Sequence, residues 1–273
     1  MSRSRVKTLL ILLLALANIF LLGLWISREA REYDRRRTMD TELERVLAGA
    51  GLYLSGALPD AAASVLDIRR DPQGERAAAE ALLGPCQEEE MGGGIVWYTG
   101  ALGSARFSWK ELSEFEIELD TPRGPAEAGD IEALAREMAL LSESAARLVR
   151  EPDGYAYIQE RALPVWGETV RFELDGEGRL TAVRGFRLPD GGYTRRDTQS
   201  RSAGWALLSL ARALREENLV PLTVRDMELG YRPSALTPET ARLTPYWRVT
   251  LERGETGEAY ECYVNAVTGA AEF

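Results

Sequence analysis

The stretch SAGWALLSLARALREE, at Ser202–Glu217, and the segments that follow it decide the fold expected for this 273-residue chain. The stretch is expected to form a helix. The segments behind it predict strands at Thr223–Tyr231, Tyr246–Glu252 and Ala259–Asn265, with a short one at Ala270–Phe273. A helix followed by antiparallel strands is typical of an α+β architecture, in which the helix covers one face of the sheet.

The part of the chain before this stretch repeats the plan. A long helix is expected at Ile131–Arg150, where apolar residues recur at helical spacing. Strands are expected at Tyr155–Glu160, Val170–Leu174 and Leu180–Leu188, and the residues DGEG at 175–178 predict a hairpin between the last two. Both parts therefore have a helix followed by antiparallel strands.

These patterns suggest a division into domains. The sequence TPRGPAEAGD at 121–130 contains two prolines and two glycines, which predicts a linker. An N-terminal α+β domain is expected at 47–120. A C-terminal domain is expected at 131–273, with two helix-plus-sheet units at about 131–190 and 202–273.

Within the first of these domains, the sequence predicts both helices and strands. Helices are expected at Ala61–Ile68 and Glu75–Leu83, the second ended by Gly84-Pro85. The glycines Gly92–Gly94 predict a turn and not a phosphate-binding loop, because no Gly-Lys-Ser/Thr follows them. Strands are expected in the stretch that begins at Gly51 and at Ile95–Gly100, Ala105–Trp109 and Glu114–Asp120.

The chain opens with an apolar run, Leu9–Ile26, that contains no charge. As a helix it is about 27 Å long, close to the roughly 30 Å hydrocarbon core of a bilayer. A cleaved signal peptide and a retained anchor both fit the basic start, but the bulky residues Trp25 and Ile26 at its end favour the anchor. We expect a cytoplasmic tail at 1–8, a transmembrane anchor at 9–26 and a juxtamembrane stalk at 27–46. The chain is then a single-pass protein of the cell membrane, with its N-terminus in the cytoplasm and its C-terminal domains outside.

One face of the expected anchor is a candidate contact surface. Ala15, Asn18, Leu22 and Trp25 fall on one side of a helix. Asn18 is the only strongly polar residue in the run, and such a side chain can hydrogen-bond to a neighbouring membrane helix, with Ala15 allowing close approach. The alternative is that the bilayer simply tolerates one asparagine.

Composition excludes several classes of function. The chain has 33 basic and 43 acidic residues, a formal net charge of −10, which argues against nucleic acid as a partner. It has no histidine, which excludes Ser-His-Asp and Cys-His nucleophile systems and histidine-ligated metals. We expect no catalytic, cofactor-binding or metal-binding residue, and therefore no enzyme.

Cysteines and carboxylates offer only weak candidates for chemistry. Cys86 and Cys262 are the only cysteines; a disulfide is possible outside the membrane, but a buried free thiol is equally natural in the strand around Cys262. Glu88–Glu90 is expected to be a solvated acidic loop; the alternative is a divalent cation site, although consecutive side chains rarely converge on one ion. Glu114, Glu116 and Glu118 alternate on one strand and form either an acidic stripe or the solvated side of a sheet.

The end of the chain resembles a known type of unit. The sequence YWRVTLERGETGEAYECYVNAVTGAAEF at 246–273 has the aromatic-led strand, polar hairpin and Tyr-Val-Asn-Ala-x-Thr-Gly ending of a PepSY-type unit. With the helix that contains Trp205, the sequence MELGY at 227–231 and the single anchor, the chain resembles the YycI family and its longer relative YycH. This chain is rich in arginine and alanine, whereas members of the YycI family are typically rich in lysine and asparagine.

The resemblance implies a function. YycI and YycH are membrane-anchored accessory regulators of a sensor histidine kinase that controls cell-wall metabolism in Gram-positive bacteria. The resemblance implies that this chain is a non-enzymatic regulator whose partners are the kinase's transmembrane helices and a YycH-like co-regulator. A homodimer or a heterodimer is possible. Two alternatives stay open, a tethered PepSY-type inhibitor or chaperone of a secreted peptidase and a cell-envelope hydrolase that uses two carboxylates.

Overall fold

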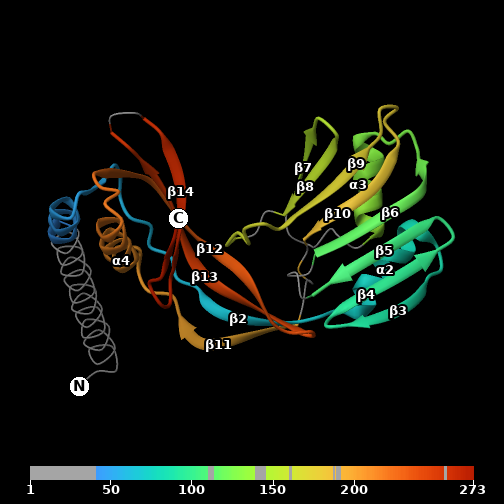
Figure 1. Ribbon diagram of the computed structural model, residues 1–273, viewed down its shortest axis with the longest axis horizontal. Helices are drawn as coiled ribbons and strands as arrows, with labels where there is room; N and C mark the ends of the chain where they lie inside the picture. Colours follow the sequence, from blue (N-terminus) through green and yellow to red (C-terminus); the bar gives the residue numbers. More distant parts are fainter. Residues whose placement is uncertain are drawn as a thin grey trace, which may run out of the picture.

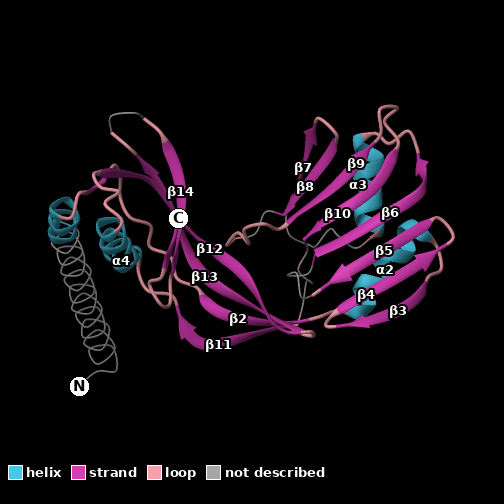
Figure 2. Ribbon diagram, in the orientation of Figure 1, coloured by secondary structure: helices cyan, strands magenta, loops and turns pink. Residues whose placement is uncertain are grey.

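The computed structural model describes residues 41–109, 114–138, 146–159, 162–186, 188, 192–254 and 257–273. They form two β-sheets with helices packed on them, so the expected α+β class is confirmed (Figures 1 and 2). Four helical segments are described: 41–49, α2 (Pro72–Leu83), α3 (Ala128–Glu137) and α4 (Ala203–Glu216). None of the helices in these ranges is long and apolar enough to cross a membrane. The expected anchor at 9–26 lies outside the described residues.

The first sheet has eight antiparallel strands in the order β3-β4-β5-β6-β10-β9-β8-β7. The first four strands form one continuous meander and the last four form another, so that β6 and β10 join the two meanders at the centre of the sheet. The strands are β3 (Gln87–Gly92), β4 (Ile95–Gly100), β5 (Gly103–Ser108), β6 (Glu114–Arg123), β7 (Ala146–Glu151), β8 (Gly154–Gln159), β9 (Thr169–Leu174) and β10 (Leu180–Phe186).

The second sheet has seven strands and is built around one long hairpin. Its central pair, β12 and β13, is antiparallel over nearly its whole length, while β1 adds to β12 in parallel. The strands are β1 (Leu52–Leu54), β2 (Ser64–Arg69), β11 (Tyr193–Gln199), β12 (Leu222–Thr237), β13 (Thr240–Glu252), β14 (Ala259–Asn265) and β15 (Ala271–Glu272).

A helix followed by a four-stranded antiparallel meander occurs three times. The units are α2 with β3–β6, α3 with β7–β10 and α4 with β12–β15. The units expected at about 131–190 and 202–273 correspond to the second and third. The first two share the eight-stranded sheet, so the boundary expected at 121–130 does not separate two sheets, and β6 itself runs to Arg123.

Each sheet buries one face under its helices. On the eight-stranded sheet, α2 and α3 share a core with Tyr98, Ile117 and Phe172. On the seven-stranded sheet, α4 packs its apolar side over strand residues that include Trp247 and Val249. The strands alternate buried and accessible residues, as β13 does along its whole length, because successive side chains point to opposite faces.

The junction between the sheets is a hydrogen-bonded cluster. Trp109, just after β5, belongs to the core of the seven-stranded sheet, and its indole N–H donates to Glu75 Oε1 of α2 at 2.8 Å. Arg70, just after β2, forms an ion pair of 2.6 Å with the other Glu75 oxygen, and both side chains are mostly buried. These contacts connect α2, which packs on the eight-stranded sheet, to the end of β2 and to the core of the seven-stranded sheet.

Two expected helices are wrong. Residues 61–68 were expected to be helical, but Ser64–Arg69 is strand β2, because Val65 and Ile68 are buried and the strand pairs with β11 and β13. The helix expected at Ile131–Arg150 is shorter and starts earlier. It begins at Ala128, where Glu127 and Asp130 form a capping box, and its expected end is strand β7. Tertiary pairing has overridden helix propensity in both segments.

The described part of the expected stalk is part of the fold. Residues 41–46 belong to the helical segment 41–49, in which Leu47 is fully buried against the core of the seven-stranded sheet. The other strands and the helices at 75–83 and 202–217 lie where the sequence placed them, within a few residues. The strand pair β12–β13 is longer than expected, since it continues through 232–245.

Candidate functional site

The face of the eight-stranded sheet opposite α2 and α3 is the candidate site, and we refer to it as the open face. On β6, Phe115 and Ile117 point into the core shared with the helices. Glu114, Glu116 and Glu118 therefore point to the open face, because strand residues alternate. The stripe of glutamates that the sequence indicated is present on one face.

A cross-strand row of large side chains crosses this face. Trp97 of β4 pairs with Arg106 of β5, which pairs with Glu116 of β6. Glu116 pairs with Arg184 of β10, and Arg184 pairs with Arg171 of β9. Directly opposed residues on neighbouring strands lie about 4.5–5.5 Å apart at Cβ, so these five side chains form a continuous row across five strands.

Arg184 makes the ion pairs that hold this row together. Its Nε donates to Glu116, its Nη1 donates to Glu173 Oε2 at 2.6 Å and its Nη2 donates to Glu118 Oε1 at 2.7 Å. Burial favours a lower pKa for Arg184, but the hydrogen bonds to the three carboxylates outweigh it and raise the pKa above its ordinary value. Arg184 therefore stays charged, and three carboxylates fix the position of its guanidinium.

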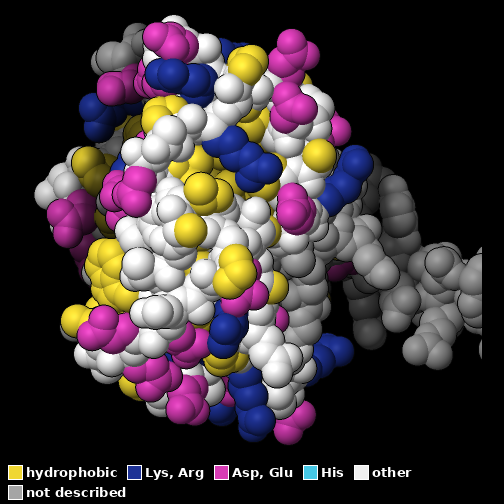
Figure 3. Space-filling view, turned by 90° about the vertical axis from the view of Figure 1, so that its right-hand side faces the viewer, with side chains coloured by type: hydrophobic (Ala, Val, Ile, Leu, Met, Phe, Trp, Pro, Cys, Tyr) yellow, Lys and Arg dark blue, Asp and Glu magenta, His cyan; other side chains and the backbone are white. Residues whose placement is uncertain are grey.

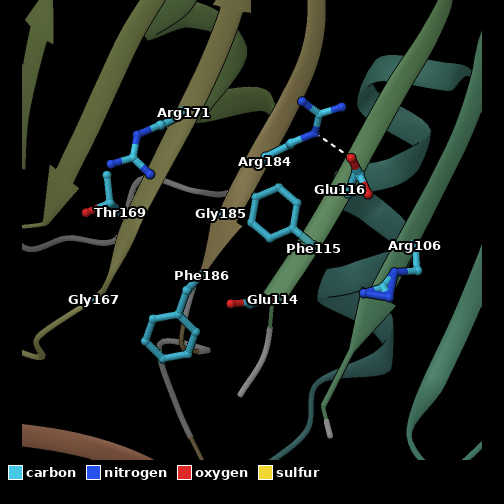
Figure 4. Close-up of a pocket in the computed structure, with 10 residues that line it drawn as sticks. All are labelled: Arg106, Glu114, Phe115, Glu116, Gly167, Thr169, Arg171, Arg184, Gly185 and Phe186. Atoms are coloured by element: carbon cyan, nitrogen blue, oxygen red, sulfur yellow. Dashed lines mark hydrogen bonds and ion pairs between the residues drawn. The ribbon is translucent and has the colours of Figure 1, made fainter. Parts of the chain in front are cut away.

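A pocket of about 300 Å³ lies beside Arg184 at one end of the open face (Figure 4). Figure 4 shows Arg106 and Arg171 on either side of the Arg184–Glu116 pair, with Phe186 and Glu114 toward the end of the strands. Phe186 also belongs to the core of the seven-stranded sheet, so the pocket ends where the two sheets meet. The lining residues are Arg106, Glu114, Phe115, Glu116, Gly167, Thr169, Arg171, Arg184, Gly185 and Phe186.

Trp97 gives the open face an apolar anchor. It is 38% exposed, although it lies on a strand within the sheet and not on a loop. Tryptophan and arginine are the residue types most enriched at the energetic centres of protein interfaces, and here they are neighbours in one row. The row can therefore bind an apolar group beside groups of either charge, which fits a protein or peptide surface.

The end of the molecule that the eight-stranded sheet and its helices form shows charges of both signs. Figure 3 shows acidic and basic side chains interspersed with apolar ones over the side formed by the eight-stranded sheet. A mixed surface selects partners by the arrangement of charges and less by their net charge.

The open face of the seven-stranded sheet is organised differently, and the sequence did not indicate it. Arg232 lies over the rings of Tyr246 and Tyr263, at 5.4 and 4.7 Å from their centroids. Arg248 lies 5.9 Å from the ring of Trp166, which in turn packs edge-on against Tyr263. Trp166 reaches this sheet from the connection between β8 and β9, where Val165 forms a parallel bridge with Tyr231.

The other residues singled out from the sequence take structural positions. Ala15, Asn18, Leu22 and Trp25, the expected contact face of the anchor, lie outside the described residues. Glu88–Glu90 forms the middle of the exposed edge strand β3 and is not a loop. Gly92–Gly94 forms the turn to β4, with positive φ at all three residues. Trp205 is partly buried at the start of α4, with the Arg201 guanidinium 4.8 Å from its ring.

The two cysteines are free and lie in separate cores. Cys86 packs with the core of the eight-stranded sheet and Cys262 with that of the seven-stranded sheet. Burial raises the pKa of the Cys262 thiol to about 12, which keeps it protonated. Among the described residues, no group of three or more acidic or cysteine side chains is placed to hold a metal ion.

Sequence reasoning found the glutamates of the site but missed its other half. Trp97 lies in a stretch recognised as a strand, but which face it occupies depends on the register with β5. Arg184 lies on a strand that the sequence predicted, but nothing in the sequence indicated its partners. Two of them lie on β6, 66 and 68 residues away in sequence, and the third lies on β9, 11 residues away. Only alternation along each strand was available as a signal, and it does not specify which strands are neighbours.

Comparisons with known proteins give no family for the chain. No family model and no curated protein matches it. An uncharacterised protein from Eubacterium rectale is similar in structure, with a TM-score of 0.42, 11% identity, and 82% of this chain and 91% of the other covered. The Bacillus megaterium YpeB C-terminal domain has a TM-score of 0.34 and 10% identity, with 76% and 97% covered. Neither similarity supports an assignment, and the resemblance to YycI and YycH remains a proposal.

Proposed function

We propose that this protein is a non-enzymatic, membrane-anchored regulator that binds a protein partner on the open face of its eight-stranded sheet. The observation that carries the proposal is the exposed Trp97 in one row with Arg106, Glu116 and Arg184. Arg184 is already held by three carboxylates, so the row is preorganised and a partner can bind with little further loss of side-chain entropy.

The resemblance to YycI and YycH suggests the partner, an extracytoplasmic part of a sensor histidine kinase. A regulator of this kind works by binding one kinase conformation better than the other, and it cannot shift the equilibrium by more than that difference in affinity. The apolar run 9–26 has the length of an anchor, and the contact face at Asn18 offers a second point of attachment to the kinase's membrane helices.

The open face is tested by co-expression and co-purification with a sensor histidine kinase of the same organism. We expect Trp97→Ala to lower the affinity about tenfold or more, since truncated hot-spot residues cost about 2 kcal/mol or more. Tyr53→Ala is the matched control, because Tyr53 is an aromatic residue that is 50% exposed on β1, away from the open face. If the two variants bind equally well, the partner does not use the open face.

The anchor is tested separately by replacing Leu9–Ile26 with an unrelated apolar helix at matched protein levels. Loss of kinase regulation with a folded outer part would support contact through the membrane. Within the native run, Asn18→Leu is expected to weaken association roughly threefold to thirtyfold, the equivalent of roughly 0.6–2 kcal/mol. Unchanged signalling in the exchanged protein would show that Leu9–Ile26 serves only to attach the protein to the membrane, and the open face would then be the proposed functional surface.

A further inference from the structure

Two helices form a parallel pair on the outside of the seven-stranded sheet. The helical segment 41–49 lies beside α4, as Figure 1 shows at one end of the molecule. Leu43 packs against Gly204 at the start of α4, where an added Cβ would lie 2.7 Å from a Leu43 methyl carbon. Gly51, just after the first helix, lies against Val220, just after the second. The two helices therefore run in the same direction, as do β1 and β12 behind them.

A groove of about 460 Å³ lies between these helices. Its middle is apolar, and the two large apolar side chains there are unusually accessible, Val46 at 58% and Leu208 at 41% exposed. An exposed apolar stripe with a polar rim is typical of a surface that contacts another protein. The lining residues are Val46, Ala50, Leu208, Ala211, Arg212, Arg215 and Glu216.

Charge is distributed unevenly along the groove. Glu42 lies one helical turn before Val46 on the same side of its helix, so an exposed carboxylate lies just beyond this end of the groove. At the opposite end, α4 presents Arg212 and Arg215. Arg212 forms an ion pair of 3.0 Å with Glu216, whereas neither Glu42 nor Arg215 has an ion pair within the described part of the chain. At Glu42 and Arg215 the unpaired charge is therefore negative at one end of the groove and positive at the other.

This distribution is self-complementary. Rotation about a twofold axis that crosses the groove near Val46 and Leu208 places the acidic end of one copy opposite the basic end of another. We propose that the groove is a homodimer interface, in which two helix pairs pack antiparallel, Val46 and Leu208 meet at the axis and Glu42 of each copy faces Arg215 of its partner. An isologous interface of this kind contains every contact twice, so each dimer has two Glu42–Arg215 pairs.

The antiparallel arrangement follows from the charges. Packing two copies in the same direction would place Arg215 against Arg215 and Glu42 against Glu42, and like charges in contact are unfavourable. A partner with a uniformly charged helix would match only one end of the groove. A second copy of this chain matches both ends and also supplies the apolar residues for the middle.

Charge reversal tests the interface in the full chain, purified in detergent and measured by sedimentation equilibrium. Each exposed ion pair contributes up to about fivefold to association, so Arg215→Glu, which removes two pairs and adds repulsion, should weaken the dimer about tenfold or more. Glu42→Arg should have the same effect. The double variant, with both charges exchanged, should recover dimerisation, and a mere loss of folding cannot produce that recovery.

Cross-linking gives an independent geometric test. Val46→Cys lies near the proposed axis and should form an intermolecular disulfide readily, whereas Asp197→Cys, exposed on β11, should not. The native cysteines do not interfere because both are buried. A monomeric wild-type chain would overturn the proposal. So would a dimer whose dissociation constant neither single charge reversal changes and that forms no disulfide through Val46→Cys.

Discussion

The open faces of the two sheets both display arginine, but they hold it in different ways. On the eight-stranded sheet, Arg184 is bound by carboxylates from β6 and β9, and the nearby Trp97 remains exposed. On the seven-stranded sheet, Arg232 and Arg248 also form ion pairs, with Glu272 and with Glu228 and Glu261. In addition they lie over aromatic rings, one of which, Trp166, comes from the β8–β9 connection.

The difference indicates which face is available to a partner. The chain covers part of the seven-stranded face with its own Trp166, for which Gly230 leaves room, since a Cβ there would lie 2.6 Å from Trp166 Cζ2. On the eight-stranded face, Trp97 remains accessible and Arg184 is fixed by its hydrogen bonds to three carboxylates. The proposed binding is therefore expected on the eight-stranded face, whereas the other face forms an internal contact between the sheets.

The largest effect is expected for the tryptophan of the covered core. Trp247 is fully buried beneath α4, and its indole N–H donates to the Arg201 carbonyl at 3.1 Å. Trp247→Ala should lower the free energy of unfolding by about 3–5 kcal/mol, whereas Trp97→Ala should lower it by less than about 1 kcal/mol. Urea denaturation measures both. Similar losses for the two variants would contradict the assignment of Trp97 to an accessible face.

Gly230→Ala should break the internal contact on the seven-stranded sheet. The added Cβ would meet the Trp166 ring and also the Pro164 carbonyl oxygen at 2.7 Å, so the segment that carries Trp166 must move. We expect a loss of about 1–3 kcal/mol, the usual cost of overpacking, and faster amide exchange around Trp166. Gly176→Ala is the matched control, because no atom lies within 4 Å of the position that a Cβ would take there. Unchanged exchange near Trp166 would show that this contact does not hold the segment.

Arg184→Met should destabilise the open face through the loss of charge pairing. Removal of the guanidinium leaves Glu116, Glu118 and Glu173 to face one another without the counter-charge that binds them. The loss of unfolding free energy, about 1 kcal/mol at low ionic strength because these groups are partly exposed, should shrink in about 1 M salt, which screens exposed charges. Urea denaturation of both proteins at low and high salt measures this. A deficit that is the same at both salt concentrations would mean that Arg184 acts by packing and not by charge.

The smallest effect concerns an ion pair of the seven-stranded sheet. Arg242 donates to Asp67 Oδ1 at 2.8 Å, and this hydrogen bond, against the opposing effect of burial and with help from Arg196, lowers the pKa of Asp67. A lowered pKa gives stability that is present above the unfolded value of about 3.9 and is lost as the pH falls through the folded value. Asp67→Asn should cost at most about 1 kcal/mol at pH 7 and nothing near pH 2. A difference that persists at pH 2 would point to packing.

Local patterns predicted elements well where tertiary pairing agreed with them. The helix at 202–217 was expected within one residue of its observed ends, since its apolar side, its cap at Ser202 and its burial under one sheet all favour the same structure. At Ser64–Arg69 the alanines before the strand favoured a helix, but pairing with β11 and β13 decided the outcome. A single sequence window cannot contain that information, because β13 lies more than 170 residues away.

The sequence alone determined that this protein is an α+β chain with repeated helix-plus-strand units, because apolar spacing and turn residues are local properties. It also determined that Glu114, Glu116 and Glu118 share one side of a strand, since side chains alternate along any strand. Only the tertiary structure decided that two units join through β6 and β10 into one sheet, and that Arg184 meets those glutamates beside Trp97. Strand order and register are set by packing between distant segments, and a site built across several strands therefore exists only once the chain has folded.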